Sequence, residues 1–296
     1  MKIIYGTDNR RDIGYLQAVI HHAKSVGIIV HKHALVKLNK SYSALVTLPF
    51  HEYVKATHQY PLCQEEVFYD QIRPVTSNNC TGFLVHEQIM ATAYHCVYPS
   101  DNHDTLPDKP WEDLRVIFDF HAGNKGAIST LIHNDTQVYS FKSVIAGEGQ
   151  ESPAEPDWIL LKLDRPVHDR PPLPMSNQKP AYKTKLYIIG HPISLPLKYA
   201  DDATSIDYSR TNNPIYRRHC FMAKLDSYGG NSGSPVFNAK THKVEGILTG
   251  GKEDFVIDNS CMLSRTVLNA HSIEYENVQR IQPAKRALTN YLNQNS

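Results

Sequence analysis

Short apolar runs, separated by polar and turn residues, make up most of the chain after residue 25. These runs are rich in Val, Ile and Leu, and few of them continue with the spacing of a long helix. Many short strands of this kind predict an all-β barrel or sandwich. The candidate strands are residues 26–30, 34–36, 44–48, 82–85, 88–93, 114–118, 158–163, 186–189, 220–223, 234–237 and 244–248.

Helical spacing is confined to the two ends of the chain. Residues 12–24 place apolar side chains on one helical face behind Asp12, a residue type that caps helix N-termini. Pro283 precedes a second run, 284–292, and proline suits the first turn of a helix. Between the ends, the loop-rich interval 165–184 is suited to connect two halves of the fold.

Length and charge exclude several classes of function. The 296 residues suffice for one large domain or two small ones. Lysine and arginine total 31 against 30 acidic residues, so the net charge is +1, and no basic stripe indicates a nucleic-acid partner. No run approaches the roughly 20 apolar residues of a membrane span, and the first residues lack the apolar core of a signal peptide. We expect no membrane span, while an intracellular location, another export route and a removed leader all stay open.

Cysteine and histidine give no metal pattern. The five cysteines include no Cys-x-x-Cys pair, and their odd number leaves at least one thiol unpaired within the chain. Sixteen histidines include the pairs at 21–22 and at 31 and 33, but no Cys, Asp or Glu stands at a matching ligand spacing. We therefore expect solvated histidines, no metal and no cofactor.

One glycine-rich stretch, residues 225–236, can present a nucleophile. It reads Leu-Asp-Ser-Tyr-Gly-Gly-Asn-Ser-Gly-Ser-Pro-Val, with Ser232 on a tight turn. Because Gly230 can adopt backbone angles closed to other residues, its N–H and that of Ser232 can turn toward one point and form an oxyanion hole. Taken alone, the same residues fit an ordinary Gly-rich turn equally well.

Two further stretches supply the other parts of acyl transfer. Thr-Ala-Tyr-His-Cys ends a candidate strand at His95, and Glu-Pro-Asp places Asp157 just before the strongly apolar strand 158–163. Acyl transfer by Ser232 needs a base for its proton, an acid that orients the base, and donors for the oxyanion. The order of the three candidates along the chain is His, Asp, Ser.

These three stretches resemble the motifs of trypsin-like serine peptidases. The likeness covers roughly residues 78–252, and the Gly-Gly-Asn-Ser-Gly-Ser-Pro-Val run is most similar to the bacterial branch that includes the V8-like glutamyl endopeptidases. The resemblance implies Ser232 as nucleophile, His95 as general base and then acid, and Asp157 as the residue that orients His95. It also implies that the backbone N–H groups of Gly230 and Ser232 form the oxyanion hole.

The resemblance further implies two perpendicular six-stranded antiparallel β-barrels. We expect an N-terminal extension with a short helix over 1–24, a first barrel over 25–175 and a second barrel over 176–296 that ends in a helix. Cys80 and Cys96 match the disulfide beside the family's catalytic histidine, which implies a secreted or periplasmic location. The expected partner is a polypeptide substrate, and the expected state is a monomer.

Departures from the family motif bear on activation and specificity. Asn231 stands where vertebrate trypsins carry the aspartate that pairs with a new N-terminal ammonium, so activation by that ion pair is not expected. Asp226, six residues before Ser232, corresponds to the pocket floor that selects Arg or Lys, although it can equally brace a loop by accepting backbone N–H bonds. Leu248 replaces the histidine of glutamate-specific relatives.

The remaining pocket residues follow from the same correspondence. Ser227 lies beside the pocket floor. Gly250 and Gly251 leave the pocket mouth open, with backbone free to pair with an extended substrate. Thr249 is expected to donate a hydroxyl bond to Asp157.

Three functions stay in competition at this point. The first is a serine endopeptidase that prefers Arg or Lys before the scissile bond, with glutamate specificity as a variant. The second is an inactive relative that binds polypeptide through the same cleft, although retention of His95, Asp157 and Ser232 favours the enzyme. The third, an esterase of another fold, requires a Gly-x-Ser-x-Gly elbow with histidine last in the chain, whereas here the histidine comes first.

Overall fold

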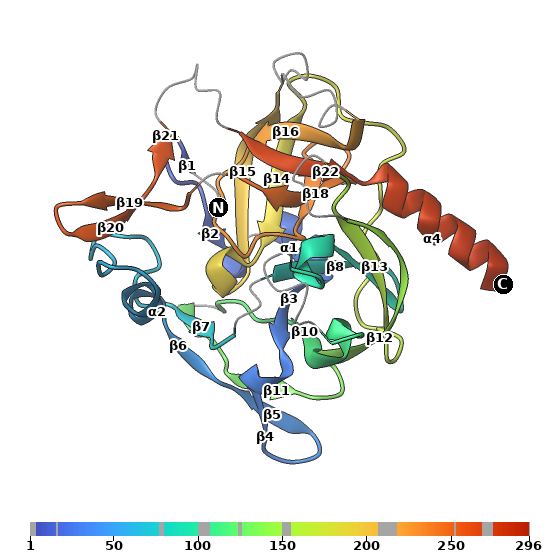
Figure 1. The fold of residues 1–296 in the computed structure, drawn as a ribbon, viewed down its shortest axis with the longest axis horizontal. Coiled ribbons are helices and arrows are strands. Elements are labelled where there is room, and N and C mark those ends of the chain that lie inside the picture. The colour runs from blue at the N-terminus through green and yellow to red at the C-terminus, as the bar shows by residue number, and fades with distance from the viewer. Residues whose placement is uncertain are drawn as a thin grey trace.

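Two closed barrels of antiparallel strands dominate the computed structural model, which describes residues 4–15, 17–76, 80–99, 107–123, 126–149, 155–206, 218–251, 253–267 and 275–295 (Figure 1). The expectation of an all-β fold with two six-stranded barrels and a short C-terminal helix is confirmed. In the described part of the chain, no helix is both long and apolar enough to cross a membrane.

The first barrel closes in the order β10-β12-β13-β9-β8-β3. Closure comes from β3, which pairs with β8 on one side and β10 on the other. The side chains of β13 are buried almost throughout, which explains the nearly continuous apolar run in its sequence. The strands are β3 (Val26–His31), β8 (Cys80–His86), β9 (Ile89–Thr92), β10 (Leu114–Phe118), β12 (Val138–Glu148) and β13 (Trp158–Leu163).

The second barrel follows the order β14-β17-β18-β22-β16-β15, and pairing between β14 and β15 closes it. A short strand from near the N-terminus, β2 (Arg11–Asp12), adds to the free part of β15. The barrel strands are β14 (Lys185–Gly190), β15 (Lys198–Ser205), β16 (Cys220–Lys224), β17 (Pro235–Asn238), β18 (Val244–Gly250) and β22 (Glu276–Arg280).

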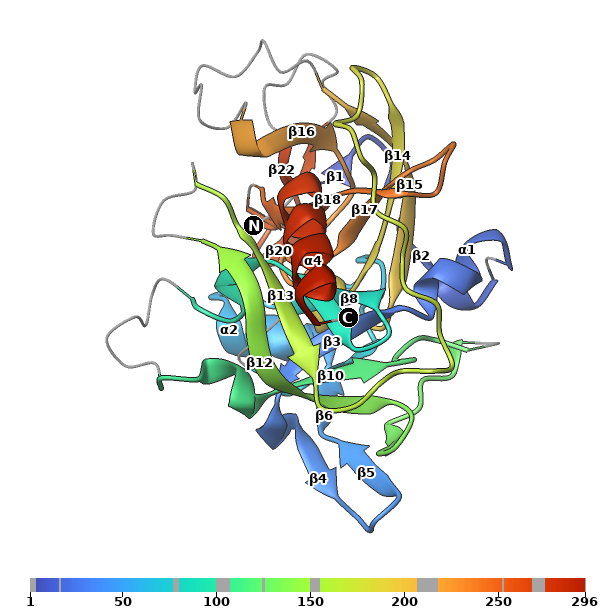
Figure 2. The same ribbon diagram turned by 90° about the vertical axis from the view of Figure 1, so that its right-hand side faces the viewer.

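The helix α4 (Gln282–Asn295) follows the second barrel in sequence but packs on the first. Its buried residues Ala284 and Leu288 join the apolar core formed with β12 and β13 (Figure 2). Pro283 stands in the first turn, where its missing N–H is tolerated. The helix thereby ties the end of the chain to the neighbouring barrel.

The section between β3 and β8 forms a separate layer beside both barrels. The hairpin of β4 and β5 projects from the molecule in Figures 1 and 2, while α2 packs against the hairpin of β19 and β20. The elements of this section are β4 (Leu35–Lys37), β5 (Tyr42–Leu45), β6 (Thr47–Pro49), α2 (Phe50–Thr57) and β7 (Ile72–Pro74). Later parts of the chain add β11 (Leu131–His133), which pairs with β5, and the hairpin of β19 (Phe255–Asp258) and β20 (Cys261–Ser264).

The first described residues lie against the second barrel. β1 (Ile4–Tyr5) pairs in parallel with β21 (Thr266–Val267). The expected N-terminal helix is present as a 3-10 turn, Ile13–Tyr15, followed by α1 (Gln17–Ala23). The expected N-terminal extension is therefore built into the folded body.

Candidate active site

His95 and Asp157 meet because their strands are neighbours. His95 lies in the 3-10 turn Tyr94–Cys96 that follows β9, and Asp157 directly precedes β13, which pairs with β9. His95 Nδ1 lies 2.6 Å from Asp157 Oδ2, and the backbone N–H of His95 donates to Oδ1 at 3.1 Å. Because an ionised carboxylate only accepts, Nδ1 is the donor and Nε2 is left as the basic nitrogen.

The expected bond from Thr249 to Asp157 is wrong. The Thr249 hydroxyl donates instead to the carbonyl of Asn277, 3.3 Å away on the paired strand β22. The backbone N–H of Asp157 donates to Oε1 of the fully buried Gln279 at 3.1 Å. The short threonine hydroxyl finds an acceptor on the adjacent strand, whereas the longer glutamine side chain reaches from the second barrel to the first.

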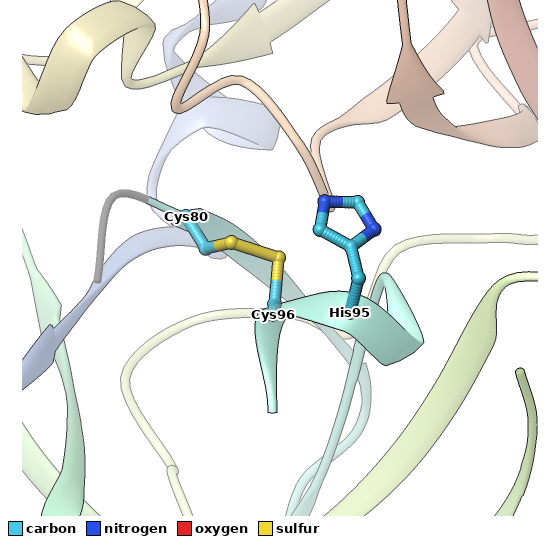
Figure 3. Close-up of side chains that lie close together, drawn as sticks. All are labelled: Cys80, His95 and Cys96. Atoms are coloured by element: carbon cyan, nitrogen blue, oxygen red, sulfur yellow. A yellow bond between two sulfur atoms is a disulfide. The ribbon is translucent and has the colours of Figure 1, made fainter. Parts of the chain in front are cut away.

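A disulfide between Cys80 and Cys96 flanks the histidine, as the resemblance implied (Figure 3). It joins the start of β8 to the turn that carries His95. Ligand-type atoms of Cys80, His95 and Cys96 all lie within 4.8 Å of one another. Sulfur atoms joined to each other are not thiolates, so this group does not provide a cysteine metal site.

Thr81 on β8 holds the serine loop against the first barrel. Its backbone N–H donates to the carbonyl of Ser232 at 2.8 Å, and its hydroxyl donates to the carbonyl of Gly230 at 3.1 Å. The same hydroxyl accepts from the backbone N–H of His191 at 3.0 Å. This fully buried threonine, one residue after the disulfide, links the loop to the strand next to that of His95.

Two positions in the serine loop require glycine. Gly230 and Gly233 have φ values of 82° and 87°, in the left-handed region. A Cβ atom at Gly233 would meet the Thr81 carbonyl oxygen at 1.9 Å, and one at Gly230 would meet the Ile193 nitrogen at 2.8 Å. The loop can therefore follow this path, with Ser232 partly exposed between the two glycines, only with glycine at these positions.

Asn231 is bonded within its own loop. Its side chain is 3% exposed, and its Nδ2 donates to the Ser227 hydroxyl at 2.8 Å. Ser227 is itself fully buried. The position that holds an ammonium-binding aspartate in vertebrate trypsins thus carries a neutral side chain with an internal partner.

Asp226 points toward the N-terminal segment. Its side chain is 4% exposed, and its two oxygens accept the backbone N–H groups of Tyr5 and Asn9 at 2.7 and 3.1 Å. Burial raises its pKa to about 6 against the opposing effect of these two bonds, and Asp8 raises it further. Of the two roles open from the sequence, the geometry matches a carboxylate that braces a loop.

The other predicted pocket residues lie along β18 and the segment after it. Leu248 is fully buried in the core of the second barrel, and its N–H donates to the carbonyl of Ser234 at 3.0 Å. Gly250 and Gly251 follow, both partly exposed. A Cβ atom at Gly251 would lie 2.2 Å from a carboxylate oxygen of the fully buried Glu276. A second acid, which the sequence did not indicate, therefore lies beside the predicted pocket mouth.

The layer formed by residues 50–74 supports the serine loop from behind. Glu66, 8% exposed, accepts the hydroxyl of Tyr228 at 3.2 Å and the N–H of Ser264 at 2.6 Å. Arg73, 1% exposed, donates from Nε to the carbonyl of Ile193 at 2.7 Å, and the Ile193 N–H donates to the carbonyl of Gly229 at 2.5 Å. No local motif marks these residues, because their partners are more than 100 positions away in the sequence.

A second disulfide pins the same layer. Cys63 pairs with Cys261 of β20 across 198 positions, a pairing that the sequence did not indicate. Cys220 is the free cysteine, buried in β16, and burial raises the pKa of its thiol to about 12. A thiol in this environment stays protonated and unreactive at neutral pH.

A family model for the trypsin-like peptidase domain matches residues 80–247, more than half of the chain and the whole stretch from the disulfide to the strand after the serine loop. The chain belongs to the trypsin-like peptidase family. This membership makes it a serine endopeptidase, as the motifs predicted. Placement within the V8-like branch stays a prediction.

A solved structure agrees with the fold of this peptidase. The VesB protease of Vibrio cholerae superposes with a TM-score of 0.52 at 11% identity, covering 97% of this chain and 68% of that chain. At this identity the likeness supports the two-barrel fold alone. Comparison with curated protein sequences found no match.

Proposed function

We propose that this endopeptidase cleaves polypeptides with a triad of Ser232, His95 and Asp157. The observation that carries the proposal is the 2.6 Å contact between His95 Nδ1 and Asp157 Oδ2, on a turn that is tied to the Ser232 loop through Thr81. A carboxylate in this position fixes the imidazole tautomer and stabilises the imidazolium that forms during reaction.

The reaction then follows from the proton positions. Ser232 Oγ attacks the substrate carbonyl carbon while His95 Nε2 accepts the hydroxyl proton, and the oxyanion that forms is bound by the N–H groups of Gly230 and Ser232. The C–N bond breaks as His95 returns its proton to the leaving amine. Water, deprotonated by His95, attacks the acyl ester, and His95 returns that proton to Ser232 Oγ as the C–O bond breaks and the acid is released.

Hydrolysis of an unstructured protein substrate tests this proposal. The full chain is expected to cleave it, and Ser232→Ala is expected to lose activity, whereas Ser129→Ala, at an exposed site, is expected to cleave at the normal rate. If the unsubstituted chain binds polypeptide but cleaves none, the inactive-binder alternative replaces the peptidase.

We propose Arg or Lys before the scissile bond as the preferred class. The buried carboxylate of Glu276 beside Gly251 favours a cationic side chain, and Leu248 offers no cation for a glutamate. A panel of Arg, Lys, Glu and Phe reporter peptides measures this preference. Equal cleavage of all four would remove Glu276 as a selector, and faster Glu cleavage would favour the glutamate-specific alternative.

Two disulfides support a secreted or periplasmic location, because such bonds persist in oxidising compartments.

A further inference from the structure

Residues 4–12, which we name the strap, run along the back of the serine loop. The strap begins in β1 beside β21 and ends in β2 beside β15. Ile4 is 1% exposed and packs in an apolar cluster that includes Tyr228, four residues before Ser232. The strap therefore touches the segment that leads into the nucleophile.

The first link between the strap and the loop is Asp226. Its two oxygens accept the backbone N–H groups of two strap residues, Tyr5 and Asn9. Bonds from backbone N–H groups to a carboxylate are stronger than neutral ones, and Asp226, which accepts them, is only 4% exposed. The position of residue 226 is thus fixed by the strap.

The second link is Arg10, which is 4% exposed. Its guanidinium carbon lies 3.6 Å from the centre of the Tyr228 ring, and its Nη2 pairs with Asp8 at 2.5 Å. A desolvated cation over an aromatic face is attracted by the ring quadrupole. Tyr228 is fully buried, and the stacked guanidinium helps to hold it in place just before Gly229, together with the bond from its hydroxyl to Glu66.

The strap is anchored at its far end by a third buried charge. Asp12 pairs with Lys198 of β15, whose side chain is 2% exposed. Burial lowers the pKa of Lys198 to about 8, although Asp12 raises it. The charged form of Lys198 therefore depends on the presence of Asp12. Anchoring at β15 holds the Arg10 and Asp226 contacts in register.

We propose that the strap, through Arg10 and Asp226, positions residues 226–231 for catalysis and so replaces activation by a cleaved N-terminus. Arg10 and Asp226 are positioning residues, since they act through the loop rather than on substrate. The inference rests on the proposed peptidase function and explains how a loop with neutral Asn231 is held in its active shape.

The test compares two arginines of the strap. Arg10→Ala removes the stacked cation, whereas Arg11→Ala removes a half-exposed arginine whose partner is Asp201 at the surface. Each full-length variant is titrated with a fluorophosphonate, and peptide hydrolysis is expressed per titrated site. We expect Arg10→Ala to lose about 100-fold in kcat/KM per site, as for a misplaced catalytic loop, and Arg11→Ala to match the unsubstituted chain.

Expressing the rate per titrated site separates positioning from stability. A purely structural role would lower the number of active molecules without changing the rate of each one, and that result would overturn the proposal. Asp226→Asn, which keeps the size of the side chain but cannot accept both N–H groups as a carboxylate does, is expected to lose roughly tenfold. A normal per-site rate in both variants would also overturn it.

A measurement on the unsubstituted chain covers the case in which both variants fail to fold. Coupling between two sites is reciprocal, so the fluorophosphonate adduct is expected to slow hydrogen exchange at the Tyr5 and Asn9 amides. Unchanged exchange in the adduct would contradict the proposed role of the strap but not the peptidase function. An unsubstituted chain that neither hydrolyses peptide nor forms an adduct would refute the peptidase function and the strap with it.

Discussion

Each side chain of the proposed triad is held by groups from more than one element. Asp157 receives the His95 ring and backbone on one side and directs its own N–H to Gln279 of the second barrel. Ser232 is fixed through its carbonyl to Thr81. Local motifs in the sequence indicated His95, Asp157 and Ser232 as candidate catalytic residues. They did not indicate Thr81, Gln279 or Arg10, because nothing near these residues in sequence reveals a partner so distant.

Replacing Asp157 by Asn is expected to reduce kcat severely. The amide can present its NH2 to His95 and so favour the wrong imidazole tautomer. By analogy, the same change in a related triad lowers turnover about 10⁴-fold. Steady-state hydrolysis measures the effect, with Asp164→Asn at an exposed position as control. Near-normal turnover in Asp157→Asn would mean that another acid orients His95.

A buried histidine near the serine loop makes stability depend on pH. His191 is 1% exposed, its Nδ1 donates to the Leu195 carbonyl, and burial lowers its pKa to about 3 despite that bond. Between pH 6.5 and 3 the unfolded chain therefore binds a proton that the folded chain does not, so stability falls as pH falls. From pH 7 to pH 5 this group is expected to cost about 2 kcal/mol.

His191→Asn removes the titration while keeping a side-chain N–H near the Leu195 carbonyl. Denaturant unfolding at pH 7 and pH 5 is expected to show a smaller pH dependence in this variant, and the exposed His168→Asn serves as control. An unchanged pH dependence in His191→Asn would assign the acid sensitivity to other groups.

At the scale of elements, the barrel strands could be predicted from the sequence, whereas the layer around residues 50–74 could not. Strands leave a local record in apolar runs such as 158–163. The layer owes its position to long-range contacts: Glu66 bonds to Ser264, and Cys63 pairs with Cys261. No spacing rule connects residues about 200 positions apart, so these contacts require the folded structure.

The Cys63–Cys261 disulfide is expected to stabilise the protein by about 2–4 kcal/mol, because it closes a long loop in the unfolded chain. The paired change Cys63→Ser and Cys261→Ser should lower the free energy of unfolding by that amount in guanidinium titrations. Cys220→Ala, which removes only the buried thiol, should cost about 1 kcal/mol. Equal losses in the two proteins would mean that the disulfide adds nothing beyond its packing.

For the whole molecule, the proposed site combines residues of both barrels. His95 and Asp157 come from the first barrel and Ser232 from the second, and α4 crosses back to bind the first barrel (Figure 2). The family motifs predicted this architecture. They could not predict that β2 adds to the edge of the second barrel, since β2 is only two residues long and its pairing with β15 spans almost 190 positions.

The central claim is that Ser232 is a nucleophile activated by His95 in the folded chain. Mass spectrometry after fluorophosphonate treatment tests it most directly. One adduct on the peptide containing Ser232 is expected in the native protein, and none in heat-denatured protein or in Ser232→Ala. A native protein without an adduct, or an equal adduct in Ser232→Ala, would contradict the account.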